Sequence, residues 1–407
     1  MTSPSAAQSA PMKPGEPAAL AALLDTPGLP AVLRALPGAR LVGGCVRDAI
    51  AGRAVADIDL ATPDPPQEAA AALAAAGLRA IPTGLAHGTL TVLSGPGRFE
   101  VTTLRRDVAT DGRHAVVAWT TDWREDAARR DFTINAMSLE RAGAVFDPFG
   151  GRADLAAGRV RFVGVAAARI AEDALRVLRF FRFQARYGVG EPDAEAVAAI
   201  AASVGDLARL SGERVWAELR RILAAPDPAG ALVLMERLGV LGAVLPGARA
   251  AGLARLVRAG GPADEVLRLA ALLAAAADVD AVAARLRLSG AERERLALLL
   301  VPEGPVPAED EAGLRRWLAA TPAEVLAGRA WLRGGDDAGW AGLRARLAAA
   351  GWPVFALEGR DVVACGVAPG PEVGRLLREL RGWWLMGGCV AGREACLARL
   401  RELLEGG

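Results

Sequence analysis

Two acids in the segment LVGGCVRDAIAGRAVADIDL, residues 41–60, have the type and spacing that metal chemistry needs. Asp57 and Asp59 are two residues apart, and side chains at that spacing on an extended strand point to one face. Two carboxylates on one face repel each other unless a cation lies between them. Mg²⁺ prefers few protein carboxylates together with phosphate oxygens, so the pair predicts a magnesium site beside a phosphorylated substrate. The alternative for an isolated Asp-x-Asp is a solvated strand edge.

A glycine pair precedes the two acids and favours the metal site. Gly43 and Gly44 lie between the strand-like run LV and the helical pattern CVRDAIAG. Glycine lets backbone N–H groups at the start of a helix approach a phosphate closely. Arg47, one turn into that helix, carries a planar guanidinium suited to the same phosphates. A dinucleotide-binding fold is disfavoured, because the third glycine of GxGxxG is missing.

A second set of polar residues is spaced for reading a base. Asp173, Arg176, Arg179 and Arg182 follow one another at intervals of three, which predicts that all four lie along one side of a helix. Cytosine and adenine both present an amino donor beside a ring-nitrogen acceptor, whereas uracil and guanine present a carbonyl beside an N–H. An Asp acceptor next to an Arg donor therefore complements C and A, and an unpaired buried group costs about 1–3 kcal/mol. The alternative is an amphipathic helix whose arginines are only solvated.

The elements that must position these residues form an α+β region followed by helices. Between about residues 31 and 165 we predict one alanine-rich helix, residues 66–76, and several short strands. The predicted strands lie in ARLVGG, GTLTVL, RFEVTTL and RVRFVGV. From residue 166 onward, apolar residues recur at helical spacing. A chain of 407 residues exceeds the usual size of one hydrophobic core, so several packed units are expected.

Five motifs in order carry a resemblance to a known family. GGCVRD followed by DID resembles the head of the class II CCA tRNA nucleotidyltransferase and poly(A) polymerase family, within the polymerase β superfamily. Further motifs resemble its ribose-selecting motif, its head-to-neck hinge, its base-reading helix and the helix that braces the reader. They are ARRDFTINAM (128–137), DPFGGRADL (147–155), RIAEDALRVLRFFRF (169–183) and LSGERVWAELRRIL (210–223). The resemblance covers about residues 38–245.

The resemblance implies a polymerase-β-like nucleotidyltransferase head with a small mixed sheet, followed by an all-helical neck, body and tail. The expected divisions are a disordered leader at 1–30, the head at 31–165, the neck at 166–230, the body at 231–330 and an RNA-binding tail at 331–407.

The catalytic residues are expected in the head. Two Mg²⁺ ions are expected, one held by Asp57 and Asp59 and a second that stabilises the departing pyrophosphate; Glu100, on a probable neighbouring strand, would be a third catalytic acid. Arg130 is predicted to contact a phosphate and Asp131 a sugar hydroxyl. An open alternative is that Asp131 caps the following segment.

By resemblance, Asp173 and Arg176 would pair with the base, and Arg179 and Arg182 would meet the triphosphate or the base edge. Asn135 is a candidate supporting residue for the sugar and phosphate contacts.

The implied activity is the addition of C, C and A from CTP and ATP to the tRNA 3′ end without a nucleic-acid template. The segment 108–128 is predicted to be a long polar loop, and its length favours full CCA addition; a merely disordered surface loop is the alternative. Rival functions are a poly(A) polymerase, a CC- or A-specific tRNA nucleotidyltransferase, and a catalytically idle RNA-binding protein. An antibiotic-modifying transferase is disfavoured by the base-reading pattern.

The composition of the chain excludes several classes of protein. A net charge of +1 argues against a uniformly basic nucleic-acid wrapper, and four cysteines without a CxxC pair suit a reduced compartment. The N-terminus lacks a signal-peptide pattern, and apolar runs are broken by charges before membrane-spanning length. We therefore expect a cytoplasmic protein without a membrane or an obligatory protein partner. The two histidines, His87 and His114, are too few for the phosphohydrolase domain of some relatives, and neither is expected to be catalytic.

The C-terminal segment 359–384 also resembles the tail of long family members. Pro371 suits the first turn of a helix. Arg375, Arg378 and Arg381 repeat every third residue, which fits either an RNA contact or an ordinary solvated face. Trp383 and Trp384 are predicted to be packing residues.

Overall fold

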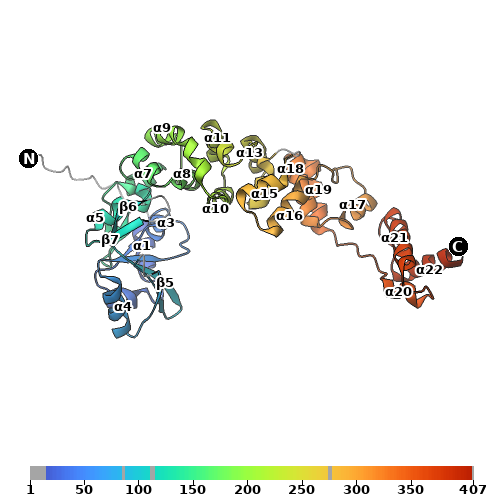
Figure 1. Ribbon diagram of the computed structural model, residues 1–407, viewed down its shortest axis with the longest axis horizontal. Coiled ribbons are helices and arrows are strands. Elements are labelled where there is room, and N and C mark those ends of the chain that lie inside the picture. The colour runs from blue at the N-terminus through green and yellow to red at the C-terminus, as the bar shows by residue number, and fades with distance from the viewer. Residues whose placement is uncertain (1–14, 85–87, 111–114, 274–276, 406–407) are drawn as a thin grey trace, which may run out of the picture. The chain divides into compact units, whose positions relative to one another are not determined.

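The computed structural model describes residues 15–84, 88–110, 115–273 and 277–405 (Figure 1). Contacts within the chain divide it into two compact units. The first unit comprises Met1–Pro226 and Leu234–Val244, and the second comprises Asp227–Val233 and Leu245–Gly407. The sheets and all the predicted site residues belong to the first unit.

A mixed sheet of seven strands forms the centre of the first unit, in the order β3-β4-β5-β2-β1-β8-β9. Its strands are β1 (Arg40–Val42), β2 (Asp59–Thr62), β3 (Arg79–Gly84), β4 (Thr89–Ser94), β5 (Gly97–Thr103), β8 (Ser138–Leu139) and β9 (Val145–Phe146). Only the β2–β5 pair is parallel among these neighbours. The predicted α+β head with a small mixed sheet is confirmed.

The register of the three central strands separates a buried row from a polar row. Leu41 lies opposite Leu60, and Leu60 lies opposite Val101; all three are buried. One position earlier on β2 and β5, Asp59 lies opposite Glu100, and both are exposed. Because successive side chains on a strand point to opposite faces, the acids point away from the hydrophobic core in which Leu41, Leu60 and Val101 are packed.

Two helices cover strands β3 and β4. The helix predicted at residues 66–76 is observed as α4 (Pro66–Ala75), and it packs with α2 (Leu29–Ala35) on that part of the sheet. The prediction of a disordered leader through residue 30 was wrong from Glu16 onward, because α1 (Glu16–Leu24) is a helix. Leu20 and Leu23 are buried, and the buried Glu16 carboxylate lies 2.7 Å from the Arg152 guanidinium. Residues 1–14 lie outside the described part.

The predicted strand RVRFVGV, residues 159–165, was wrong. Phe162 makes a single antiparallel bridge to Phe132, and no named strand forms there. The Phe162 ring packs instead against Phe132 and Phe180, with centroids 4.7 and 6.1 Å away. Gly164 then turns the chain with a φ of 70°, so the pairing stops after this one bridge and its two backbone hydrogen bonds, and the Phe162 ring is buried by aromatic packing.

The prediction of a polar loop at residues 108–128 was also wrong for its described part. An antiparallel ribbon of β6 (Arg105–Thr110) and β7 (Ala115–Trp119) is followed by α5 (Trp123–Ala128). The run AVVAW at 115–119 is β-branched and aromatic, which favours a strand. Residues 111–114, which include His114, and residues 85–87, which include His87, lie outside the described residues.

The rest of the first unit is helical, as predicted. Its helices are α6 (Gly151–Ala156), α7 (Ala166–Glu172), α8 (Leu175–Tyr187), α9 (Ala194–Ala202) and α10 (Gly212–Leu223). The single reader helix expected over 169–183 is two helices, because the backbone of Asp173 is extended between α7 and α8. Phe180 and Phe181 are fully buried beneath α8, which fixes the face that carries its arginines.

The second unit is helical throughout its described secondary structure. After α11 (Ala229–Arg237) and α12 (Val240–Val244), where the chain passes between units, ten helices follow. They are α13 (Ala250–Arg258), α14 (Glu265–Leu272), α15 (Val279–Leu286), α16 (Gly290–Leu300), α17 (Glu311–Leu318), α18 (Ala323–Arg333), α19 (Ala338–Ala349), α20 (Gly359–Ala364), α21 (Pro371–Met386) and α22 (Arg393–Glu405).

The C-terminal helices agree with the sequence in three respects. Pro371 begins α21. Trp384 is 2% exposed and its indole N–H donates to the carbonyl oxygen of Ala391, so it is a packing residue. Arg375 is paired with Glu372 and Glu379 at 2.6 and 2.9 Å, which is typical of a solvated helix face.

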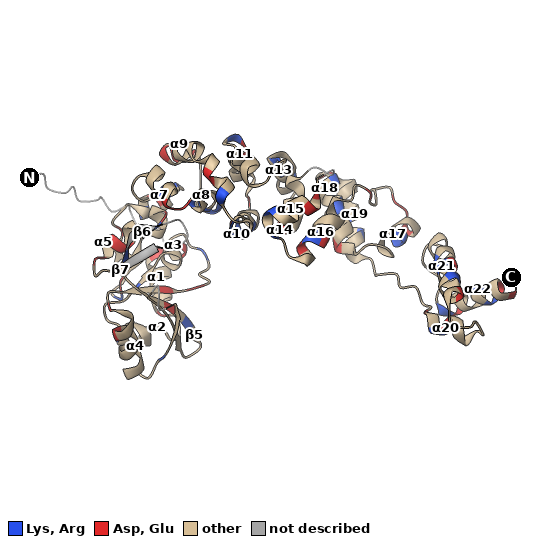
Figure 2. Ribbon diagram, in the orientation of Figure 1, with Lys and Arg blue, Asp and Glu red and all other residues tan. Residues whose placement is uncertain are grey.

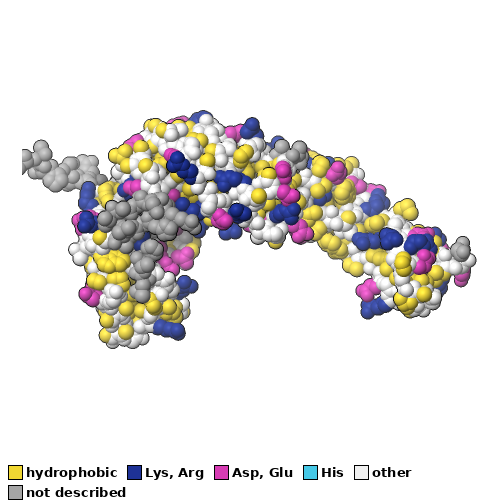
Figure 3. Space-filling model, in the orientation of Figure 1, with side chains coloured by type: hydrophobic (Ala, Val, Ile, Leu, Met, Phe, Trp, Pro, Cys, Tyr) yellow, Lys and Arg dark blue, Asp and Glu magenta, His cyan; other side chains and the backbone are white. Residues whose placement is uncertain are grey.

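Charge is interspersed along both units. Figure 2 shows basic and acidic positions scattered over the helices of both units, and the face seen in Figure 3 carries arginines among acidic and apolar side chains. In the described residues no single helix is long and apolar enough to cross a membrane; the bent pair α1 and α2, at 73°, meets the criteria of length and composition together.

Candidate active site

The glycine turn is built as the sequence predicts. Strand β1 ends at Val42, Gly43 adopts a φ of 69°, and α3 (Gly44–Ile50) begins at once. The positive φ favours glycine, and a Cβ there would also lie 2.8 Å from a guanidinium nitrogen of Arg130, which would have to move away. The turn therefore places the start of α3 directly beside Arg130.

The three predicted acids line one open crevice of about 620 Å³ on the head. Asp57 precedes β2, Asp59 begins it, and Glu100 lies opposite Asp59 on β5. Partial loss of hydration raises the pKa of Asp59, the charges of Glu100 and Asp57 raise it further, and Arg130 opposes them. The acids thus repel one another, as the sequence predicted for a pair that shares a cation.

The donor set fits a magnesium ion only in part. Among the described residues no group of three side chains from His, Cys, Asp and Glu converges closely enough to hold a metal. Two exposed carboxylates, Asp57 and Asp59, remain, and Mg²⁺ commonly takes one or two protein carboxylates and completes its shell with water and phosphate oxygens. The pair therefore suits Mg²⁺ bound together with a nucleotide, and the charge of Glu100 acts on Asp59.

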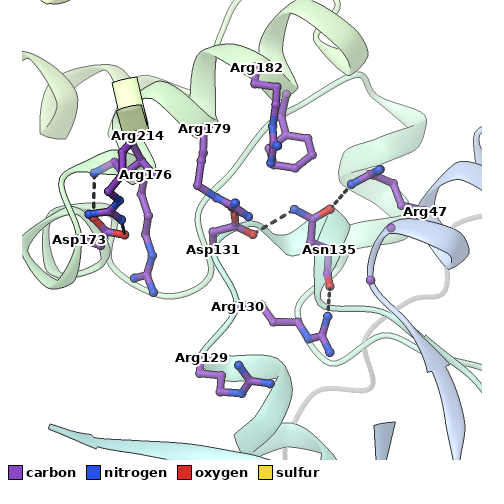
Figure 4. A pocket seen from close by; sticks show the side chains of 14 residues that line it. Arg47, Arg129, Arg130, Asp131, Asn135, Asp173, Arg176, Arg179, Arg182 and Arg214 are labelled. Atoms are coloured by element: carbon purple, nitrogen blue, oxygen red, sulfur yellow. Dashed lines mark hydrogen bonds and ion pairs between the residues drawn. The ribbon is translucent and has the colours of Figure 1, made fainter. Parts of the chain in front are cut away.

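The predicted nucleotide-binding residues converge on one cavity of about 500 Å³ (Figure 4). Those lining it are Gly43, Gly44, Arg47, Arg130, Asp131, Asp173, Arg176, Arg179 and Arg182. The sequence reasoning did not select Arg129 and Arg214, which also line this cavity. A cavity so rich in arginine is suited to a polyphosphate.

Asp131 connects the residues at the middle of the cavity through one ion pair and two hydrogen bonds. It is 6% exposed, and its Oδ2 lies 2.7 and 2.5 Å from two nitrogens of Arg179. Its Oδ1 accepts hydrogen bonds from the backbone N–H of Phe132 and the amide of Asn135. Burial alone would raise the pKa of Asp131, but Arg179 and these hydrogen bonds hold the pKa below its usual value. Figure 4 shows Asn135 between Asp131 and Arg47.

Two neighbouring arginines share one buried acid. Asp126 is 2% exposed and lies 2.7 Å from Arg129 and 3.2 Å from Arg130. Burial opposes ionisation, yet the two arginines lower the pKa of Asp126. The i,i+3 and i,i+4 spacing of Asp126 in REDAARR was the available sequence signal for this pairing.

Asp173 and Arg176 both line the cavity, and each already has an ion-pair partner. Asp173 accepts hydrogen bonds from the backbone N–H of Leu175 and from Arg214, the latter at 2.7 Å. Arg176 pairs with Glu172 and donates to the carbonyl oxygen of Arg169. The prediction that Asp173 lies on the reader helix was wrong, because its side chain bonds the first turn of α8 from outside.

The brace helix α10 supplies partners for the reader arginines. Arg182 lies 3.3 Å from the buried Glu218 and stacks over Phe183 at 4.5 Å. Burial lowers the pKa of Arg182 to about 10, while Glu218 opposes that shift. Arg214 and Glu218 are four residues apart, so both lie on the α10 face turned to α8. The sequence identified the brace motif but not these two residues.

Acid should weaken the ion pair at the centre of the cavity. Because the folded pKa of Asp131 lies below its unfolded value of about 3.9, its contribution is present above that pH and is lost as pH falls through the folded pKa. We expect wild type to exceed Asp131→Asn in urea midpoint at neutral pH, and the difference to shrink toward pH ~3. Circular dichroism across a pH series measures it.

Asp206→Asn is the matched control, since Asp206 and Arg209 form an exposed pair at 3.8 Å. A difference between wild type and Asp131→Asn that stays constant with pH would contradict the assignment.

Comparison with known proteins shows which family has this architecture. The family model of the poly A polymerase head domain matches residues 39–161, and that of the probable RNA and SrmB-binding site of polymerase A matches residues 191–251. The CCA tRNA nucleotidyltransferase 1, mitochondrial, of Mus musculus is 37% identical over 385 residues, which span 89% of this chain and 86% of the relative.

The same protein of Homo sapiens is 35% identical over 376 residues, spanning 89% of this chain and 86% of the relative. A crystal structure of the Bacillus stearothermophilus CCA-adding enzyme in complex with CTP superposes with a TM-score of 0.73 at 27% identity, covering 97% of this chain and 99% of that one. Since the likeness extends over most of each chain, the protein belongs to the CCA tRNA nucleotidyltransferase and poly(A) polymerase family, and it is a nucleotidyltransferase.

Proposed function

We propose that this chain adds C, C and A to the 3′ end of tRNA, using CTP and ATP and no nucleic-acid template. The observation that carries the proposal is the cavity in which Asp173 and Arg176 meet Arg47 of α3, Arg179 and Arg182 of α8, and the two arginines that follow α5, Arg129 and Arg130. Its volume of about 500 Å³ lies in the range usual for small-molecule sites. The CCA-adding relatives agree with this reading.

The arginines of the cavity would bind the triphosphate. The guanidinium groups of Arg130 and Arg47 lie against Gly43 and Gly44, and all four residues line the cavity. The α-phosphate would then be oriented toward the crevice that holds Asp57 and Asp59. Orientation of the RNA 3′-hydroxyl for in-line attack supplies much of the catalysis in phosphoryl transfer.

Mg²⁺ is the metal that we propose for Asp57 and Asp59. When bound, it would lower the pKa of the attacking 3′-hydroxyl and neutralise charge on the departing pyrophosphate. The two carboxylates would hold the ion, because negatively charged carboxylates and phosphate oxygens approach one another only with a cation between them. Glu100 would maintain the negative field that favours the cation.

Choice of base would follow from exchange of partners. Asp173 is bonded to Arg214, and Arg176 to Glu172. Cytosine and adenine would offer an amino donor to Asp173 in place of Arg214, and a ring-nitrogen acceptor to Arg176 in place of Glu172. Asp173 would still accept a hydrogen bond and Arg176 would still donate one. Uracil or guanine would leave both groups unpaired, and unpaired buried groups are costly.

A poly(A) polymerase is the second candidate, because the matched head model is that of a poly A polymerase. To separate the two, purified protein is given tRNA that ends at the discriminator base, with CTP alone, ATP alone or both, and the products are sequenced. We expect two C residues with CTP, followed by a single A and a stop when ATP is present. An open-ended A tail on unrelated RNA would favour the second candidate, and CC or A alone would identify a specialised enzyme.

The idle RNA-binding alternative is tested by the same assay, since no nucleotide would be added. The cytoplasmic location and the independence from a protein partner remain predictions. Activity of the protein purified alone would support the latter.

A further inference from the structure

The only tyrosine of the chain, Tyr187, ends helix α8 beside the glycine turn. It is 7% exposed, and its hydroxyl donates a hydrogen bond to Oδ1 of Asp48 on α3. The bond joins residues 139 positions apart in the sequence. None of the family motifs identified in the sequence includes Tyr187, so its role has to come from its contacts.

Asp48 in turn accepts hydrogen bonds from Arg47 with both carboxylate oxygens. Arg47 Nε lies 3.1 Å from Oδ1, and Nη2 lies 3.0 Å from Oδ2. On the other side, Nη1 donates to Oδ1 of Asn135 at 2.5 Å. The guanidinium also lies over the Tyr187 ring, 4.6 Å from its centroid. Arg47 is therefore fixed on three sides by side chains.

Counting donors shows what is left for a ligand. A guanidinium has five N–H groups, and the three bonds to Asp48 and Asn135 use three of them. One N–H on Nη1 and one on Nη2 remain, in a side chain that lines the cavity. Two neighbouring N–H groups in one plane match two oxygens of a phosphate.

We propose that Tyr187 is a positioning residue which, through Asp48, aims these two N–H groups of Arg47 at the phosphate chain of the incoming nucleotide. The inference rests on the proposed function, because it assigns Arg47 to the triphosphate. Asp48 Oδ1 receives the Tyr187 hydroxyl as well as Arg47 Nε, so the hydroxyl restrains the carboxylate against rotation. Contact with phosphate and not with the base makes the effect equal for CTP and ATP.

Replacing Tyr187 by phenylalanine isolates the hydroxyl. The ring would still pack under Arg47, and it would still face Arg53 and Arg186, whose guanidinium carbons lie 4.8 and 6.0 Å from its centroid. Only the bond to Asp48 is lost. The matched control is Ser203→Ala, which removes a hydroxyl bonded to the Ala199 carbonyl oxygen at 2.7 Å in the same unit but away from the cavity.

Dissociation constants of CTP, ATP and cytidine are measured by calorimetry for the full-length wild type, Tyr187→Phe and Ser203→Ala. We expect Tyr187→Phe to weaken CTP and ATP each about tenfold, to change cytidine less than about twofold, and Ser203→Ala to change none of them. Unchanged CTP binding in Tyr187→Phe, or an equal loss for CTP and cytidine, would overturn the assignment.

A second variant guards against misfolding. Asp48→Asn keeps the size of the side chain but weakens its hold on Arg47, and the same triphosphate-specific loss is expected. Since binding is measured without tRNA, failure of CCA addition would refute the proposed function while leaving this result intact. Equal binding of CTP by wild type and Asp48→Asn would refute the role of the Tyr187–Asp48–Arg47 series alone.

Discussion

Asp57→Asn is expected to lower kcat for CTP addition by about 10³-fold or more while leaving CTP affinity in the arginine cavity nearly unchanged. The asparagine keeps the shape of the side chain but removes one of the two charges that suit a cation. Asp57 lines the open crevice and not the cavity that holds the nucleotide-binding arginines. The two functions should therefore separate in one variant.

Stability should not account for that loss. Asp57 is exposed, and exposed substitutions usually change the free energy of unfolding by less than about 0.5 kcal/mol. Single-turnover addition of CTP to tRNA, together with thermal unfolding, measures both properties. Glu68→Gln is the control, because Glu68 is an exposed acid of the same head on α4 and outside the crevice. If Asp57→Asn kept more than a tenth of the wild-type rate, the proposed catalytic role of the acids would be refuted.

The motifs allowed the contents of the cavity to be predicted from sequence. Gly43 is needed because its φ is positive, and that demand follows from a strand that turns directly into a helix. The three-residue spacing of Arg176, Arg179 and Arg182 was enough to place them on one face of α8, since Phe180 and Phe181 define the buried face. Local periodicity therefore determined which residues meet.

Partners of those residues could not be predicted in the same way. Arg179 pairs with Asp131 from 48 positions away, and Arg214 pairs with Asp173 from 41 positions away. Such contacts depend on how the helices pack, and no local pattern encodes that packing. The hydroxyl of Tyr187 is the extreme case, because its partner Asp48 lies on the glycine-turn helix.

The prediction of secondary structure was wrong where a short segment fitted a periodic pattern and a different local structure equally well. Residues 159–165 alternate as a strand would, yet Phe162 is buried by aromatic neighbours. Asp173 fits the helical spacing of the arginines, but an aspartate favours the position before a helix, where its side chain accepts backbone N–H groups. In both cases tertiary packing or capping outweighed the periodic signal.

Asp173 is also the residue whose replacement should most change the choice of base. Asp173→Ala is expected to reduce the preference for CTP over UTP by about 10- to 100-fold, because it removes an acceptor that complements the amino group of cytosine. The rate of addition of the correct base should fall less, since Asp57 and Asp59 belong to the separate crevice. Competition between CTP and UTP on tRNA that lacks CCA measures the preference.

The alanine variant carries a structural cost, because Asp173 bonds the Leu175 N–H at the start of α8 and pairs with Arg214. Loss of a cap costs about 0.5–2 kcal/mol. Asp173→Asn separates the effects, since asparagine still accepts the backbone N–H but presents an amino donor where the base also has one. We expect Asp173→Asn to retain more stability than Asp173→Ala and yet to lose the preference for CTP. A variant that kept wild-type selectivity in either form would show that the base is chosen elsewhere in the cavity, and Arg176 with Glu172 would then be the next pair to test.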